Sequence, residues 1–195
     1  WRFYLVLKLT SPMSWGAWIL VGIYPVSILL AWVTTPERWK VPVRERIRAV
    51  PVVGRVEAWA MERVPLLALL NIVLGAALGI YTGVLLGTMA ARPLWNSALL
   101  GPLFLVSGLS SGAAFMLLYR LSDQERTSLG RADMGLIAAE LALLAPWMMG
   151  LASGGAPSQA ALAAIMGGPY TAAFWTLVVA LGLLVPLAGE WVEHK

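Results

Sequence analysis

Long runs without charge dominate this chain and alternate with two segments rich in arginine. Five apolar runs, four of them without charge and one with a single glutamate, have about the 20 residues that a helix needs to cross the hydrocarbon core of a bilayer. They are residues 14–33, 66–91, 97–119, 134–152 and 170–189. Because backbone polar groups in lipid must bond within their own segment, we expect all five runs to be helices. The pattern therefore predicts an all-α, polytopic transmembrane helical bundle, with residues 1–195 forming a single transmembrane domain.

Composition supports a membrane protein. Hydrophobic residues make up 59% of the 195 residues, charged residues only 12%, and the mean hydropathy is +0.78. A soluble domain of this length could not hide so much apolar surface from water.

Lysine and arginine are concentrated in two of the connections. Segment 34–65 contains seven of them and the segment after Tyr119 three more: Arg38, Lys40, Arg44, Arg46, Arg48, Arg55 and Arg63, then Arg120, Arg126 and Arg131. With five spans these connections fall on one side, which the positive-inside rule makes cytoplasmic. The opposite, outer face then holds Arg92 and the uncharged segment 153–169. We interpret the basic segments as attachments to anionic lipid rather than as a nucleic-acid surface.

Cysteine and histidine restrict the cofactors that this protein could hold. The sequence contains no cysteine, which excludes an iron–sulfur cluster held by thiolates. Its single histidine, His194, lies outside every predicted span, whereas a membrane haem normally takes an axial histidine from within the helices. We therefore expect no metal and no bound cofactor in this protein.

Two predicted helices carry glycines at four-residue spacing. In the second span glycine recurs at every fourth position from Gly75 to Gly87, and the third span has Gly108 and Gly112. Small residues at this spacing allow helices to approach closely in membranes. We expect both rows to be helix-packing surfaces. Three serines flank the second row: Ser107, Ser110 and Ser111.

Tyr81 lies almost opposite the glycine row of the second span. At 100° per residue, Thr88 and Arg92 fall within about 20° of Tyr81 on the same helix. If the helix continues through Arg92, it presents two hydroxyls and a guanidinium along a line to the outer surface. The alternative is that Tyr81 only hydrogen-bonds a neighbouring helix and that Arg92 extends to the lipid headgroups.

The fourth span contains an acidic residue, Glu140, seven residues after Asp133 and on the same face. An ionised carboxylate at the bilayer centre costs a few kcal/mol, so Glu140 must be paired, protonated or beside a wet cavity. A proton relay through Glu140 and Asp133 is one hypothesis. A hydrogen-bonded, structural glutamic acid is the other.

Four segments resemble, in order and spacing, the membrane subunit of polysulfide reductases, the NrfD-like family. They are Thr-Ser-Pro-Met-Ser-Trp-Gly-Ala-Trp at 10–18, Tyr-Thr-Gly-Val-Leu-Leu at 81–86, Arg-Pro-Leu-Trp-Asn at 92–96 and Phe-Leu-Val-Ser-Gly-Leu-Ser-Ser-Gly at 104–112. Members of that family usually have eight or more helices. The resemblance therefore implies an internal piece that begins before the third family helix and lacks the last.

The resemblance also implies a function. Such a subunit of the bacterial or archaeal cytoplasmic membrane binds quinol or quinone near the outer face and exchanges electrons with a docked iron–sulfur subunit. That partner serves a catalytic subunit with molybdopterin or a cytochrome, and the membrane subunit has no redox cofactor of its own. By the resemblance, Tyr81 and Thr88 contact the quinone, and Arg92, Trp95 and Asn96 lie where the iron–sulfur subunit docks.

Two other functions stay open at this point. An ion or solute transporter subunit would also use glycine-rich helices and a buried acid, although it would more often show internal repeats. A purely structural membrane anchor would need no ligand. Whether the protein takes part in catalysis is therefore undecided by the sequence.

Overall fold

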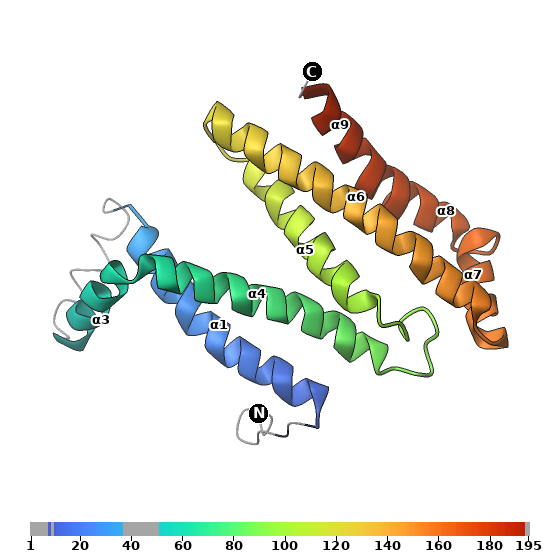
Figure 1. Ribbon diagram of the computed structural model, residues 1–195, viewed down its shortest axis with the longest axis horizontal. Helices are drawn as coiled ribbons and strands as arrows, with labels where there is room; N and C mark the ends of the chain where they lie inside the picture. The colour runs from blue at the N-terminus through green and yellow to red at the C-terminus, as the bar shows by residue number, and fades with distance from the viewer. Residues whose placement is uncertain (1–7, 9, 37–50, 194–195) are drawn as a thin grey trace. The chain divides into compact units, whose positions relative to one another are not determined.

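The computed structural model describes residue 8, residues 10–36 and residues 51–193. The described residues form helices and no strands (Figure 1). Five helices are long and apolar enough to cross a membrane: Pro12–Thr34, Val64–Gly87, Leu100–Leu117, Asp123–Ser153 and Thr171–Val192. The predicted all-α fold with five spans is confirmed.

The elements follow one another along the sequence as short and long helices. They are α1 (Pro12–Thr34), α3 (Pro51–Glu62), α4 (Val64–Gly87), α5 (Leu100–Leu117), α6 (Asp123–Ser153), α7 (Ala156–Met166), α8 (Thr171–Ala173), the π-helix η2 (Phe174–Leu184) and α9 (Val185–Glu193). The protein divides into two compact units, Trp1–Tyr81 and Thr82–Lys195. A single domain stays a prediction.

In the first unit, α1 and α4 lie side by side and run in opposite directions (Figure 1). Three pairs fix their register. Gly16 faces Tyr81, Gly22 faces Leu74, and the Ser27 hydroxyl donates a 2.6 Å hydrogen bond to the Asn71 side chain. Residue numbers rise along α1 as they fall along α4, as antiparallel neighbours require.

Helix α3 lies within segment 34–65, where the hydropathy pattern predicts only a basic connection. Proline at its first position suits a helix start, since that residue has no intrahelical partner for an N–H. Ala60 and Glu57 form its buried side, and α3 packs against α1. The basic residues Arg38 to Arg48 of this segment, and His194, lie outside the described residues.

In the second unit, α5 packs along one side of α6, and η2 and α9 lie along its other side (Figure 1). Four buried residues make up its hydrophobic cluster: Leu100, Trp147, Leu151 and Ile165. Segment 153–169, expected as a connection, contains helix α7, which contributes Ile165 to this cluster.

The glycine rows behave differently from one another. A methyl group at Gly83 would overlap the backbone of Leu100 and Gly101, so the start of α5 approaches α4 closely there. Gly75, Gly108 and Gly112 have no atom of the described residues within 4 Å of such a group. The packing surface predicted for the second span is confirmed at Gly83. The row in the third span makes no helix contact within the described residues.

Helix boundaries also depart from the hydropathy pattern. Helix α6 begins at Asp123 rather than near Met134 because Ser122 and Glu125 form a capping box. The Ser122 N–H donates to the Glu125 carboxylate at 3.0 Å, and the Glu125 N–H donates to the Ser122 hydroxyl. Arg126 and Arg131 therefore lie on the first turns of a long helix. Helix α4 ends at Gly87 rather than at Ala91.

Candidate functional site

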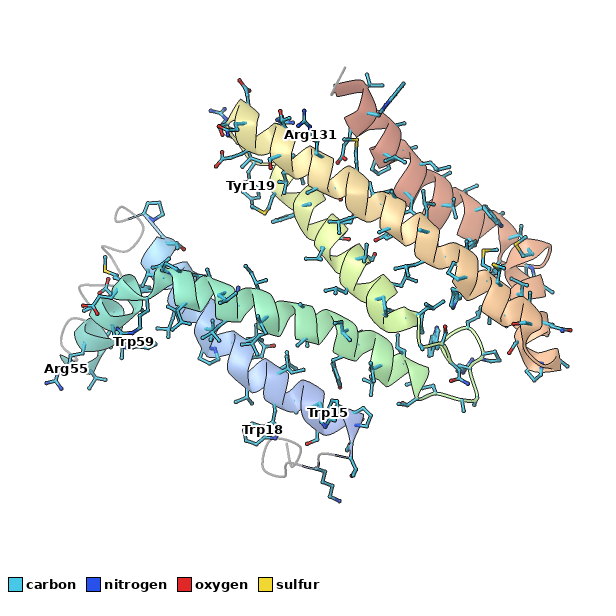
Figure 2. All side chains as sticks on the ribbon, in the orientation of Figure 1. Trp15, Trp18, Arg55, Trp59, Tyr119 and Arg131 are labelled. Carbon is cyan, nitrogen blue, oxygen red and sulfur yellow. The ribbon has the colours of Figure 1, made fainter. Side chains whose placement is uncertain are left out.

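Tyr81 packs against α1 at Gly16. A methyl group built on Gly16 would overlap the Tyr81 ring and its hydroxyl, so the phenol fits only because residue 16 has no side chain. Gly16 and Ala17 are buried, whereas Trp15 and Trp18 are exposed (Figure 2). The motif at 10–18 thus exposes its two tryptophans and turns Gly16 toward α4. The close Gly16–Tyr81 contact was not predicted from the sequence.

Thr88 and Arg92 do not continue the helical line from Tyr81. Helix α4 ends at Gly87, and the Thr88 hydroxyl donates a 2.7 Å hydrogen bond to the Leu85 carbonyl. The backbone then proceeds in short turns, in which the Arg92 N–H donates to the Met89 carbonyl. The prediction of one stripe through Arg92 is wrong because it assumed that the helix continues through Arg92, whereas it ends at Gly87.

The turn at 92–96 contains the three side chains for which the family resemblance implies a partner surface. Arg92, Trp95 and Asn96 are all exposed. The Trp95 and Asn96 N–H groups both donate to the Arg92 carbonyl, at 2.9 and 3.0 Å. The buried Trp147 of α6 donates its indole N–H to the Leu94 carbonyl at 3.3 Å. A core side chain therefore holds a turn whose polar and aromatic groups face outward.

Asp133 and Glu140 line one cavity of about 300 Å³ in the second unit. They are 1% and 6% exposed, so both carboxyl groups are buried. The cavity lies among α5, α6, η2 and α9, and its other lining residues are Ser107, Ser110, Ser111, Ala114, Ile137, Val178, Gly182, Leu183 and Pro186. The prediction that the two acids share a helix face is confirmed.

Three serine hydroxyls of α5 share the lining of this cavity with the two acids. Asp133 Oδ1 has no hydrogen-bond partner among the described residues. A buried oxygen of this kind costs free energy unless a proton or water satisfies it. Two helical turns separate the acids, about 10 Å along α6. The cavity could hold water molecules linking one acid to the other.

Sequence reasoning placed the three serines beside a packing surface and missed their place in the cavity. Their spacing on α5 carried the signal, since Ser107, Ser110 and Ser111 share a helix face. The wide turns of η2 also went unpredicted, because no sequence rule distinguishes an apolar π-helix from an α-helix. Such turns often occur at functional sites.

Comparison with known proteins identifies the family. The family model described as polysulphide reductase, NrfD, matches residues 1–194. The chain belongs to the NrfD polysulphide reductase family. This agrees with the five apolar helices and confirms the resemblance carried by the four motifs.

Three relatives illustrate the match. Protein NrfD of Escherichia coli is 33% identical across the whole sequence, and the NrfD homolog of Haemophilus influenzae is 29% identical over 96% of it. A third relative, one of the polypeptides of the polysulfide reductase of Wolinella succinogenes, is 33% identical over 67% of it. The matches span 64%, 60% and 43% of the length of these relatives. No solved structure matches this sequence closely.

Proposed function

We propose that this protein is part of a membrane subunit that binds quinol or quinone at Tyr81 and exchanges electrons with an iron–sulfur subunit docked at the 92–96 turn. Family membership and the name of the polysulfide reductase relative support a subunit of a respiratory oxidoreductase. The observation that carries the proposal is the Tyr81 ring held against Gly16, because it joins the two family motifs at 10–18 and 81–86.

Tyr81 would orient the quinone ring rather than supply most of the affinity. One hydrogen bond contributes about 0.5–1.5 kcal/mol net. Burial of the ring and isoprenoid tail supplies more, at about 25 cal/mol per Å² of apolar surface. A phenol held by a close backbone contact points its hydroxyl in one direction. Thr88 is exposed and hydrogen-bonded to Leu85, and it would add a second hydroxyl once that bond is exchanged.

The Tyr81→Phe variant of the intact complex tests this assignment. It keeps the ring that packs on Gly16 and removes only the hydroxyl. We expect the KM for quinol to rise about two- to tenfold, as the loss of one hydrogen bond predicts, with the amount of assembled complex unchanged. A KM equal to that of the parent complex would refute the role of Tyr81.

The 92–96 turn would be the docking surface for the iron–sulfur subunit. Its support is the exposure of Arg92, Trp95 and Asn96 together with the anchoring of Leu94 by Trp147. An arginine and a tryptophan at the centre of an interface commonly contribute more than 1 kcal/mol each.

The Arg92→Ala variant tests docking separately from quinol binding. We expect the iron–sulfur subunit to dissociate about tenfold more readily from the purified complex. The Arg120→Ala variant is the control, since Arg120 is an exposed arginine outside this turn. Equal co-purification from both variants would argue against the docking surface.

We further propose that Glu140 and Asp133 relay protons through the cavity of the second unit. Oxidation of a quinol releases protons with its electrons, and a membrane subunit needs a route by which protons meet water. The buried acids, the serines that share their cavity and the unpartnered Asp133 oxygen support such a route. Electrons would pass directly between quinone and the partner's clusters, with no redox cofactor bound by this protein. The proposed location is the bacterial cytoplasmic membrane.

A further inference from the structure

We propose that α3 is an interfacial helix that lies on an anionic membrane leaflet, with Val52, Val56 and Trp59 inserted at the boundary of the acyl chains. This role is separate from the quinone site and from the 92–96 turn. It concerns a helix that hydropathy alone did not detect.

Helix α3 has three distinct faces at 100° per residue. Ala60 and Glu57 face α1 and are 0% and 8% exposed. Val52, Val56 and Trp59 fall within about 60° of one another and are 62%, 38% and 45% exposed. Of the other positions, Val53 is half-buried in the groove beside α1, and five are exposed: Gly54, Arg55, Ala58, Met61 and Glu62. The side of α3 that holds Ala60 and Glu57 thus packs on protein, whereas the face formed by Val52, Val56 and Trp59 is exposed among the described residues.

The position of α3 places this second face at the edge of the membrane. Helix α1 contains 23 residues, about 34 Å of helix, against a hydrocarbon core of about 30 Å. Between α1 and α3 lies an apolar groove of about 190 Å³, lined by Ile28, Leu29, Trp32, Val53, Val56 and Glu57. These α1 residues belong to its last turns, and α4 begins at Val64 directly after α3. The helix is therefore attached where two spans leave the bilayer, and the groove can accept part of an acyl chain.

Charge indicates which kind of leaflet α3 would meet. Segment 34–65 carries seven lysines and arginines against four acidic residues. Arg55 is exposed and extends away from α3 (Figure 2). The Arg63 guanidinium lies 5.2 Å from the centroid of the Trp59 ring and 3.2 Å from Glu62. Amphipathic helices with arginine beside tryptophan and aliphatic residues bind anionic lipid surfaces.

Spin labels can measure the depth of α3 because the protein has no cysteine of its own. Single variants Val52→Cys, Val56→Cys and Trp59→Cys place a label on the proposed face, and Ala58→Cys places one on the opposite side as a matched control. The full protein is labelled in nanodiscs of phosphatidylcholine with phosphatidylglycerol, and collisions with oxygen and with a water-soluble nickel chelate are recorded. We expect labels at 52, 56 and 59 to favour oxygen and the label at 58 to favour the nickel chelate.

Two outcomes would overturn the proposal. Equal access of the nickel chelate to all four positions would mean that α3 stands in water. Low access of both reagents at 52, 56 and 59 would mean that another protein segment covers this face.

The choice of anionic lipid is tested by Arg55→Gln, with Arg55→Lys as the control that keeps the charge. We expect the preference of the protein for spin-labelled phosphatidylglycerol over phosphatidylcholine to fall by up to about fivefold in Arg55→Gln, as one basic residue at a membrane surface predicts. It should be unchanged in Arg55→Lys. Equal preferences in both variants would refute the electrostatic part of the proposal.

Discussion

The two units place polar groups in the membrane in opposite ways. In the first, a phenol packs directly on a glycine, and one pair of polar side chains, Ser27 and Asn71, forms a short hydrogen bond between helices. In the second, two buried acids line a cavity of about 300 Å³ with serines around them. Close contact fixes the direction of a side chain, whereas space beside a carboxyl group admits water and allows protonation to change. The first arrangement suits orientation of a ligand and the second suits proton transfer.

Replacing Glu140 by glutamine should have the largest effect if this comparison is right. Glutamine keeps the size of the side chain and its ability to form hydrogen bonds, but it cannot carry a proton through a cycle of release and uptake. We expect quinol turnover by the intact complex, or the protons moved per electron, to fall about hundredfold, the lower range for a positioned acid–base group. Steady-state turnover and proton uptake by proteoliposomes measure the two quantities.

The Ser110→Ala variant is the matched control for the cavity. It removes a hydroxyl from the same lining without removing a carboxyl group, and a water molecule can take the place of the hydroxyl. We expect less than about a threefold change, since water-mediated bonds are nearly as favourable as direct ones. Unchanged turnover and unchanged proton movement in Glu140→Gln would leave Glu140 a structural residue. Proton movement without any redox partner would instead favour a transporter.

Enlarging Gly16 should have the next largest effect, and on the first unit. In Gly16→Ala the new methyl group overlaps the Tyr81 ring, which must move away from its packed position. Overpacking of this kind costs about 1–3 kcal/mol. We expect the KM for quinol to rise about tenfold, which corresponds to about 1.4 kcal/mol. Steady-state kinetics of the complex with a soluble quinol analogue provide the measurement.

Gly22→Ala tests whether the Gly16 effect belongs to the tyrosine. Gly22 lies on the same helix, and a methyl group there would contact the Leu74 side chain at 3.5 Å, an ordinary van der Waals distance. Its KM should stay within about twofold of the parent value, since such contacts are tolerated. If both alanine variants raise the KM equally, α1–α4 packing as a whole matters and the position of Tyr81 does not.

The contrast between the units also explains what the sequence could predict. Runs of apolar residues predict the spans because the bilayer sets their length. The family motif at 81–86 makes Tyr81 a candidate for the quinone contact. Helix α3 was not predicted because Arg55, Glu57 and Glu62 lower the hydropathy of its segment. Val52, Val56 and Trp59 nevertheless keep helical spacing. The capping box at Ser122 and Glu125 was readable in principle, but hydropathy locates the membrane rather than the helix end.

The neighbours of Tyr81 and of the two buried acids were harder to predict than Tyr81, Asp133 and Glu140 themselves. Gly16 has no side chain to suggest chemistry, and only the antiparallel register of α1 and α4 brings it to Tyr81. The serines of α5 line the cavity because α6 and η2 lie beside them, which is long-range information that periodicity lacks. Asp133 and Glu140 were predictable because their spacing on one helix is local.

Removing the Ser27 hydroxyl should have the smallest effect and tests whether shape, rather than hydrogen bonding, holds the first unit. The Ser27→Ala variant loses its 2.6 Å hydrogen bond to Asn71. Such bonds between membrane helices contribute about 0.6 kcal/mol on average. We expect a shift of a few degrees or less in thermal unfolding in detergent and an unchanged KM for quinol. Thr34→Ala is the control, since that hydroxyl donates within its own helix to the Leu30 carbonyl at 2.7 Å. A loss of assembly in Ser27→Ala alone would mean that this polar pair, and not the fit of Tyr81 to Gly16, holds α1 against α4.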